Sequence, residues 1–191
     1  MGDESVRGWD VKTGKERFVL HGHPKNFFLW SAAVHPTNEQ LVTGGGYGLV
    51  IFWDLQKKKA ARTIALNSAP SDLAWHPDGV RLFIATAGRL MIVDGKSGKT
   101  LNELDSEQHN LQAIAVSPDG KLVAAGGGGT VRGGASSKKN SVIHVWNVKT
   151  GRKEVRLVGH TQRVSSIVFK PDGKELLSVS FDNTLRSWQV V

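Results

Sequence analysis

Residues 158–190 read "VGHTQRVSSIVFKPDGKELLSVSFDNTLRSWQV", and their pattern is the best guide to the architecture of the chain. Together with the residues just before it, this stretch contains four short runs of β-strand character, at 154–160, 164–171, 175–182 and 184–191. The Pro-Asp-Gly between the second and third runs predicts a tight turn, because proline fixes φ while aspartate and glycine accept the remaining turn geometry. The four runs therefore predict a small antiparallel sheet.

The same pattern recurs along the chain. An apolar run that ends in proline appears four times, with the prolines at positions 36, 77, 118 and 171. A second landmark, an alternating run that ends near tryptophan, falls at Trp9, Trp53, Val93, Trp146 and Trp188. The separation of the two landmarks is 17 residues (36 to 53), 16 (77 to 93), 28 (118 to 146) and 17 (171 to 188). Two landmarks that keep register over four units predict an all-β repeat protein.

One of these units imitates a phosphate-binding loop. The segment 93–100, "VDGKSGKT", follows an apolar run and ends in Gly-Lys-Thr. A phosphate loop needs glycine where this chain has Val93, because the backbone must close around the phosphates there. The sister segments "WDVKTGKE" (9–16) and "WNVKTGRKE" (146–154) occupy the same place in their units. We therefore interpret 93–100 as a repeated turn between two strands, and we expect no nucleotide cofactor.

Composition narrows the function classes. The 191 residues include no cysteine, which rules out thiolate catalysis and cysteine zinc sites, and the net charge of +8 leaves an acidic partner open. No run is long enough to span a membrane, and the N-terminus lacks the apolar core of a signal peptide. We expect a cytoplasmic protein that makes no membrane contact. His21 and His23 suggest a metal pair, but they lack a neighbouring carboxylate or cysteine in the sequence, and we expect no metal site.

The unit at 158–190 resembles a WD repeat, and the likeness extends over residues 3–191. The resemblance implies a β-propeller segment built of four-stranded antiparallel blades. It also implies that a Gly-His histidine, a Ser or Thr, an Asp and the Trp form a hydrogen-bonded tetrad that locks each blade. In the last unit these positions are His160, Ser178, Asp182 and Trp188. A buried imidazole and a buried indole each need such a partner.

The other units depart from this tetrad. In the first complete unit His23, Thr43 and Trp53 match, but Tyr47 stands in place of the aspartate. The second unit has Phe83, Ala87 and Val93 at the tetrad positions, so we expect its network to be lost. In the third unit Trp146 is present, and Asn140 takes the aspartate position.

Counting strands predicts an incomplete propeller. We expect residues 1–191 to form a single WD-repeat domain, with a partial repeat at 3–11 and repeats at about 17–55, 61–95, 99–148 and 154–191. The strand near 17–22 could close a four-bladed ring by pairing with 184–191, but the strand at 5–11 would compete for that place. We favour an open arc of roughly four blades. The exposed sheet edges of such an arc would promote self-association.

Candidate contacts with partners lie in the loops that join the blades. The third unit carries an insertion at 126–141 whose basic residues Arg132, Lys138 and Lys139 either reach a partner or belong to a tolerated surface loop. Polar and aromatic residues near the Gly-His loops and the loops before the Trp strands complete the set of candidates: Asn26, Phe27, Tyr47, Gln162, Arg163 and Phe181. For Phe27 and Phe181 the alternative is packing between blades.

We expect a non-catalytic scaffold that mediates contacts between proteins, since the family resemblance points there and the sequence lacks a catalytic constellation. One alternative is a regulatory or sensor segment of a larger multidomain enzyme. Another is an anion or nucleic-acid binder that uses the lysines of the repeated turns, which the repeat register places on one rim. Nucleic acid is the weaker partner class, because no aromatic residues alternate with these lysines to stack on bases.

Overall fold

The computed structural model describes residues 5–26, 28–37, 40–107, 110–128 and 141–190. In this part of the chain the regular structure is β-strand, apart from a single 3-10 turn, η1, at Gly46–Gly48. The strands, in chain order, are β1 (Ser5–Trp9), β2 (Glu16–His21), β3 (Leu29–Val34), β4 (Gln40–Gly45), β5 (Leu49–Asp54), β6 (Lys59–Ala65), β7 (Asp72–Trp75), β8 (Arg81–Ala85), β9 (Arg89–Asp94), β10 (Thr100–Asp105), β11 (Leu111–Val116), β12 (Leu122–Gly127), β13 (Ile143–Asn147), β14 (Lys153–Leu157), β15 (Val164–Phe169), β16 (Glu175–Ser180) and β17 (Leu185–Gln189). The prediction of an all-β chain is confirmed.

The strands form separate small sheets in which neighbours along the chain pair antiparallel. Three sheets have four strands, in the orders β3-β4-β5-β6, β7-β8-β9-β10 and β11-β12-β13-β14. At one end of the row β1 pairs only with β2, and at the other end β15, β16 and β17 make a three-stranded sheet. The four-stranded antiparallel blade that the repeats predict is therefore present three times in full.

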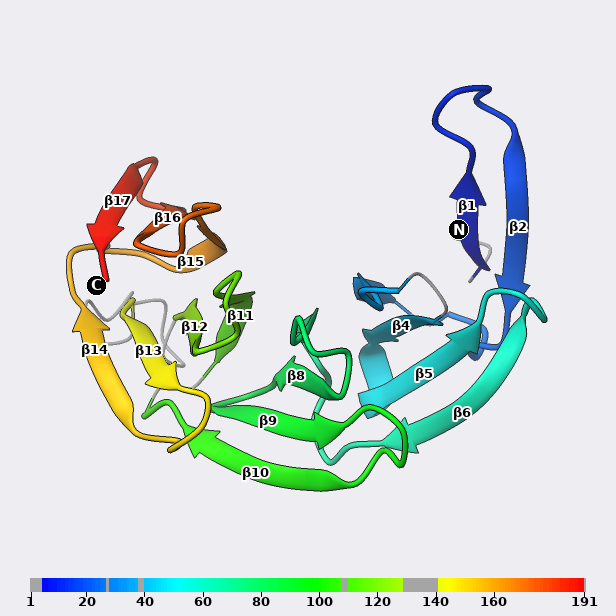
Figure 1. Ribbon diagram of the computed structural model, residues 1–191, viewed down its shortest axis with the longest axis horizontal. Coiled ribbons are helices and arrows are strands. Elements are labelled where there is room, and N and C mark those ends of the chain that lie inside the picture. The colour runs from blue at the N-terminus through cyan, green and yellow to red at the C-terminus, as the bar shows by residue number, and fades with distance from the viewer. Residues whose placement is uncertain (1–4, 27, 38–39, 108–109, 129–140, 191) are drawn as a thin grey trace.

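Figure 1 shows the five sheets side by side in a curved row that does not close. Strands β2, β6, β10 and β14 lie on the convex side of the row. The first strands of successive sheets contact one another: β3 contacts β7, β7 contacts β11, and β11 contacts β15. The row is part of a propeller, and its two ends lie apart, one carrying β1 and β2 and the other β17.

Each sequence repeat is offset from the sheets by one strand. The run at 154–160 opens the last repeat, but β14 (Lys153–Leu157) pairs with β13 of the preceding sheet. In the same way β2 pairs with β1 and not with β17. The pairing of 17–22 with 184–191, which would close a four-bladed ring, therefore does not occur, because the backbone groups that β2 would offer to β17 lie at the opposite end of the row.

The core is divided among the gaps between neighbouring sheets. On β5 the side chains of Val50 and Phe52 pack into one apolar cluster with the next sheet, while Ile51 and Trp53 pack into another with β2. This alternation follows from the two-residue period of a strand, and it requires apolar residues on both faces of a sheet that is covered on both sides. All four residues are at most 2% exposed, and each burial contributes about 1.5–3 kcal/mol.

The loops divide into two sets because antiparallel strands alternate in direction. We call the side with segments 22–26, 46–48, 66–71, 86–88, 158–163 and 181–184 the loop face. The opposite side, the turn face, carries the Pro-containing turns and the turns after the third strand of each sheet, such as 76–80, 95–99 and 148–152. No helix in the described residues has the length and apolar character that crossing a membrane requires.

Candidate functional site

The last sheet contains a continuous relay of hydrogen bonds. The indole N–H of Trp188 donates to Ser178 Oγ at 2.8 Å, and Ser178 Oγ lies 2.8 Å from His160 Nε2. On the other side of the ring, His160 Nδ1 donates to Asp182 Oδ2 at 2.8 Å. Because Ser178 accepts from the indole, its hydroxyl hydrogen is available to His160 Nε2. The direction of every bond from Trp188 to Asp182 is then determined.

The environment of Asp182 supports this relay. Burial would raise the pKa of the Asp182 carboxyl, but hydrogen bonds from Thr184, from the Thr161 N–H and from His160 hold it well below its usual range. The carboxylate is therefore ionised at neutral pH and fixes the proton of His160 on Nδ1. That these four residues lock the blade remains a prediction.

The first complete repeat has a shorter version of the relay. Trp53 Nε1 donates to Thr43 Oγ1 at 2.7 Å, and Thr43 Oγ1 lies 2.7 Å from His23 Nε2. Tyr47, which stands in place of the aspartate, is 76% exposed and has a φ of 58°, so its side chain leaves the relay and faces solvent. Without a carboxylate, burial lowers the pKa of His23, and the ring is neutral at pH 7.

In the second repeat the sequence-based assignment of Phe83 is wrong by one residue. Thr43 pairs with Ile51 and Ser178 with Arg186, and the residue that pairs with Met91 in the matching register is Ile84. The separation of the paired residues is one position shorter here, with seven positions from Ile84 to Met91 against eight from Thr43 to Ile51 and eight from Ser178 to Arg186, so counting back from Val93 misplaces the position. Ile84 and Val93 are both fully buried, and apolar packing replaces the polar relay in this sheet.

The predicted partner-binding residues fall into two separate groups and a set that cannot be placed. Asn26 and Tyr47 lie in loops of the β3–β6 sheet, which the bond from the Gly46 N–H to the Phe28 carbonyl holds together at 2.9 Å. Gln162, Arg163 and Phe181 lie in the last sheet, as the next paragraph describes. Phe27, Arg132, Lys138 and Lys139 lie outside the described residues, as does Asn140.

Phe181 is on the surface of the loop face. Its ring is 52% exposed, and the Arg163 guanidinium stacks on it with 4.2 Å between the guanidinium carbon and the ring centroid. The Phe181 N–H donates to the Arg163 carbonyl, and the Ser180 hydroxyl donates to the Gln162 carbonyl at 2.9 Å. The three residues thus form a compact aromatic and cationic patch whose backbone is fixed by the adjacent loop.

A pocket that no sequence motif marks lies on the loop face near the inner strands. Its volume is about 690 Å³, and it spans three sheets. Its lining residues are Leu29, Trp30, Ser68, Ala69, Ser71, Ala87, Asn110 and Gln112. Trp30 is 56% exposed, so apolar aromatic surface borders the pocket. We call this cavity the loop-face pocket. It combines apolar walls with amide and hydroxyl groups, the mixture that binding pockets use for shape and orientation.

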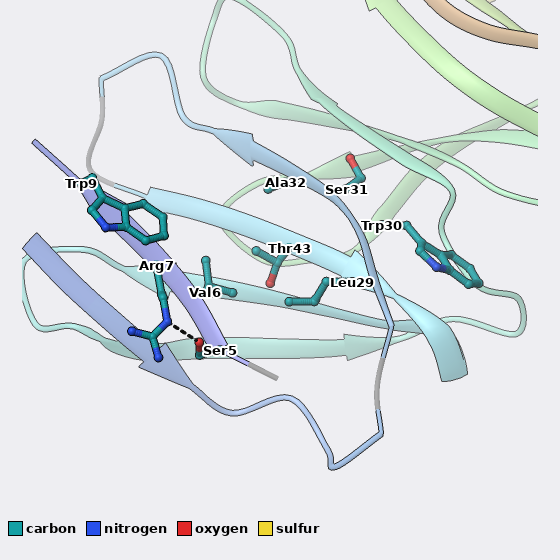
Figure 2. Close-up of a pocket in the computed structure, with 9 residues that line it drawn as sticks. All are labelled: Ser5, Val6, Arg7, Trp9, Leu29, Trp30, Ser31, Ala32 and Thr43. Carbon is teal, nitrogen blue, oxygen red and sulfur yellow. Dashed lines mark hydrogen bonds between the residues drawn. The ribbon is translucent and has the colours of Figure 1, made fainter. Parts of the chain in front are cut away.

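A second cavity, of about 430 Å³, separates β1 from β3. Figure 2 shows Trp9 and Trp30 at its two ends, with Val6, Leu29 and Thr43 between them. Arg7 points to one side, where its Nε donates to Ser5 Oγ at 3.1 Å. The cavity exists because the first sheet has only β1 and β2, whereas every complete sheet places two further strands at this position.

The turn face is less basic than the lysine count suggests. Arg81 pairs with Asp78 at 2.9 Å, Lys121 with Asp119 at 3.2 Å and Lys57 with Asp54 at 3.4 Å. The ammonium of Lys153 turns to Glu107, at 2.8 Å. These carboxylates offset part of the positive charge that an anionic ligand would need. Among the described residues no three His, Asp or Glu side chains gather in a way that could hold a metal ion.

Comparison with known proteins agrees with this architecture. A family model described as "WD domain, G-beta repeat" matches residues 14–54, 98–132 and 151–189, which make up more than half of the chain. The chain belongs to the WD-repeat family. The matched WD repeats begin with the outer strand of one sheet and end in the next.

Several curated WD-repeat relatives are much longer than this chain. Human echinoderm microtubule-associated protein-like 3 is 24% identical over 90% of the chain, which spans 18% of that protein. The 77 kDa echinoderm microtubule-associated protein of Lytechinus variegatus is 30% identical over 84% of the chain and 23% of its own length. The target of rapamycin complex subunit wat1 of Schizosaccharomyces pombe is 26% identical over 98% of the chain and 59% of its own length. The chain thus spans less than two thirds of each of these relatives.

Proposed function

We propose that this WD-repeat chain is a non-catalytic scaffold that binds a segment of a partner protein in the loop-face pocket. The observation that carries the proposal is the exposed Trp30 beside a cavity of about 690 Å³ that also offers the side chains of Asn110 and Gln112. Tryptophan is enriched among the residues that dominate binding energy at protein interfaces. The amides can hydrogen-bond to the backbone of an extended peptide, which has a donor and an acceptor at nearly every residue.

The names of the relatives support a role in contacts between proteins. Two of those compared are microtubule-associated proteins, and a third is a subunit of a complex. The proposal includes a cytoplasmic location, which the microtubule association in these names favours. The paired carboxylates of the turn face favour this function over an anion or nucleic-acid binder.

The experiment is selection of binding peptides from a random displayed library on the immobilised chain, followed by measurement of Kd for the selected peptides. We expect Trp30→Ala and Gln112→Ala to weaken these peptides by about tenfold or more, as at other interface hot spots. Leu101→Ala removes a side chain that is 56% exposed on β10, and it serves as the matched control that leaves Kd unchanged. If Trp30→Ala leaves the Kd of the selected peptides unchanged and Phe181→Ala raises it, the binding site is the patch of Arg163 and Phe181 and not the loop-face pocket.

Self-association is a second candidate, because β1 and β17 each pair with a strand on one side only. Leu185 on β17 is 65% exposed and adds apolar surface to that edge. Unpaired strand edges are templates for pairing with another chain. If two copies pair at these edges, sedimentation will show a fraction of dimer that increases with protein concentration, and Leu185→Lys will reduce that fraction. A chain that stays monomeric at all concentrations would remove this candidate and leave peptide binding unaffected.

A further inference from the structure

Asp72, at the start of β7, joins three successive sheets. Its Oδ1 accepts a hydrogen bond of 2.8 Å from the hydroxyl of Ser31 on β3, in the preceding sheet. Its Oδ2 accepts a hydrogen bond of 2.8 Å from the backbone N–H of Ile114 on β11, in the following sheet. The contact with β3 is reciprocated, since the Leu73 N–H donates to Ser31 Oγ at 3.0 Å. A single carboxylate thus connects β3 and β11 through β7.

This carboxylate is half-buried, and both of its oxygens accept hydrogen bonds. Burial raises the pKa of Asp72, while the bonds from Ile114, Ser31 and its own neighbour Leu73 act in the opposite direction. Withdrawing a carboxylate from water without hydrogen-bond donors is unfavourable, so the three donors stabilise Asp72 in this position. A side chain held in this way on both sides has little freedom to move, and it transmits its position to both neighbours.

Only one of the matching positions in the described strands carries a carboxylate that connects three sheets in this way. The positions that match Asp72 in the strand register are Ser31 on β3, Ala113 on β11 and Ser166 on β15. None of these has a carboxylate. The three strands that Asp72 connects, β3, β7 and β11, are also the strands whose ends enclose the loop-face pocket.

We propose that Asp72 is the positioning residue of the loop-face pocket, which it holds in shape by fixing the spacing of β3 and β11. This inference rests on the proposed function of that pocket. Each bond of Asp72 lies beside a pocket wall: Trp30 precedes Ser31, Ser71 precedes Asp72, and Gln112 lies two residues before Ile114. Ser71 adds a second link, since its hydroxyl donates to the Leu111 carbonyl at 2.6 Å.

The test compares two substitutions of Asp72. Asp72→Asn can keep both cross-sheet bonds, because the amide oxygen can accept from Ile114 while the NH₂ donates to Ser31 Oγ, and it loses only the local bond that Oδ1 accepts from the Leu73 N–H. Asp72→Ala loses both. Asp172→Asn is the control for the lost charge, since Asp172 accepts only a local bond from the Lys174 N–H in an exposed turn. The first readout is native-state hydrogen exchange of the Ile114 amide. The second is acrylamide quenching of the fluorescence of Trp30, which is isolated by subtracting the signal of the same variant carrying Trp30→Phe.

We expect Asp72→Ala to speed exchange of Ile114 by about tenfold or more and to change Trp30 quenching, while Asp72→Asn stays within about threefold of the parent. Equal acceleration of all amides, or no change at Trp30, would overturn the proposal, because it would reduce Asp72 to a general stabiliser. If Asp72→Ala does not fold, Ser31→Ala decides: we expect a change at Trp30 with Ile114 still protected, and an unchanged Trp30 overturns the proposal.

These readouts need no ligand, so they can succeed where the proposed function fails. If exchange of Ile114 and quenching of Trp30 change as expected but no displayed peptide binds, the positioning role of Asp72 is supported and the proposed peptide binding is refuted. With peptides in hand, we expect Asp72→Ala to weaken binding by about tenfold and Asp72→Asn to retain it. Peptide binding that is equal in both variants would overturn the positioning role while leaving the proposed function intact.

Discussion

His35 Nε2 donates a hydrogen bond of 2.7 Å to the carbonyl oxygen of Gly79, and this bond joins the Pro-containing turn of one sheet to that of the next. The contact is repeated one sheet further on, where His76 Nε2 donates to the Gly120 carbonyl at 2.8 Å. Both histidines directly precede the proline of their turn. The histidine in this position therefore has an inter-sheet role on the turn face.

We expect His76→Ala to lower the free energy of unfolding by about 2–4 kcal/mol, because the ring is 6% exposed and its loss leaves both a void and an unpaired Gly120 carbonyl. Urea unfolding followed by tryptophan fluorescence measures the change. Lys170 occupies the same place before Pro171 and forms a partly exposed ion pair with Glu175, so Lys170→Ala is the control, with a cost of about 1 kcal/mol or less. Equal costs for the two variants would contradict the inter-sheet role.

Removal of the central hydroxyl of the last relay tests whether it locks the sheet. We expect Ser178→Ala to cost about 1–3 kcal/mol, since Trp188 Nε1 and His160 Nε2 both lose their partner inside the protein. Ser187→Ala removes an exposed hydroxyl that bonds only to Glu175, and we expect a change of about 0.5 kcal/mol or less. Thermal unfolding of the two variants is the measurement. A Ser178 variant as stable as the Ser187 variant would show that the relay is dispensable.

His144 gives the protein a specific sensitivity to acid. Burial lowers the pKa of His144 to about 4, with the nearby Lys153 and Arg156 acting in the same direction and Glu107 and Asp105 against it. Above about pH 6.5 the ring is neutral in both states and has no effect. As the pH falls from there to about 4, the unfolded chain gains a proton that the folded chain does not, so stability declines. The loss reaches on the order of 3 kcal/mol, because each unit of the difference between the pKa of 6.5 and the pKa of about 4 contributes about 1.4 kcal/mol.

The matched variant is His144→Met, because Met91 occupies the same register position in the neighbouring sheet. We expect unfolding midpoints of the parent to fall between pH 7 and pH 4.5, and those of the variant to fall less. Parallel pH profiles of the two proteins would exclude His144 as the cause. Below about pH 4 both should lose further stability, because Asp182 gains a proton in the unfolded chain while its low pKa keeps it ionised in the folded chain.

Two glycines separate the cost of backbone strain from the cost of crowding. Gly14 has a φ of +67° with no atom within 4 Å of an added Cβ, whereas at Gly48, with a φ of +72°, a Cβ would lie 2.2 Å from the Leu66 carbonyl oxygen. We expect Gly14→Ala to cost about 1 kcal/mol from the left-handed backbone alone. Gly48→Ala must also displace the loop beside it, so we expect at least twice that cost by urea unfolding. Equal losses of unfolding free energy in the two variants would mean that the loop containing Leu66 moves aside at no measurable cost.

Much of the fold could be predicted from residues that repeat. The proline and tryptophan landmarks gave the strand order and the open arc, because each marks a turn or a buried position that every sheet needs. Phe83 was misassigned in place of Ile84, since the length of a surface loop is not constrained by the core. The sequence also could not show that Lys153, which follows one of the repeated turns, pairs with Glu107.

The loop-face pocket could not be predicted, because the side chains that line it differ from one unit to the next. Trp30, Ser71 and Gln112 occupy the same position in three successive units, 41 residues apart, but they share no residue type or motif. Asp72 was overlooked for a similar reason: the other aspartates of the chain favour turns, and nothing local shows that Ser31 and Ile114 will meet it. Contacts between sheets depend on curvature, which no single repeat specifies.

The core is divided into clusters, and each cluster is shared by two neighbouring sheets. The sheets therefore form a linear array in which each one packs only on its neighbours. In such an array stability is a sum over adjacent interfaces, with no interior element that all others depend on. The first sheet contributes only Leu20 to the fully buried part of its cluster, whereas the sheets in the middle are covered on both sides. Unzipping should therefore start at the ends and travel inward, and the sheets around the loop-face pocket should open last.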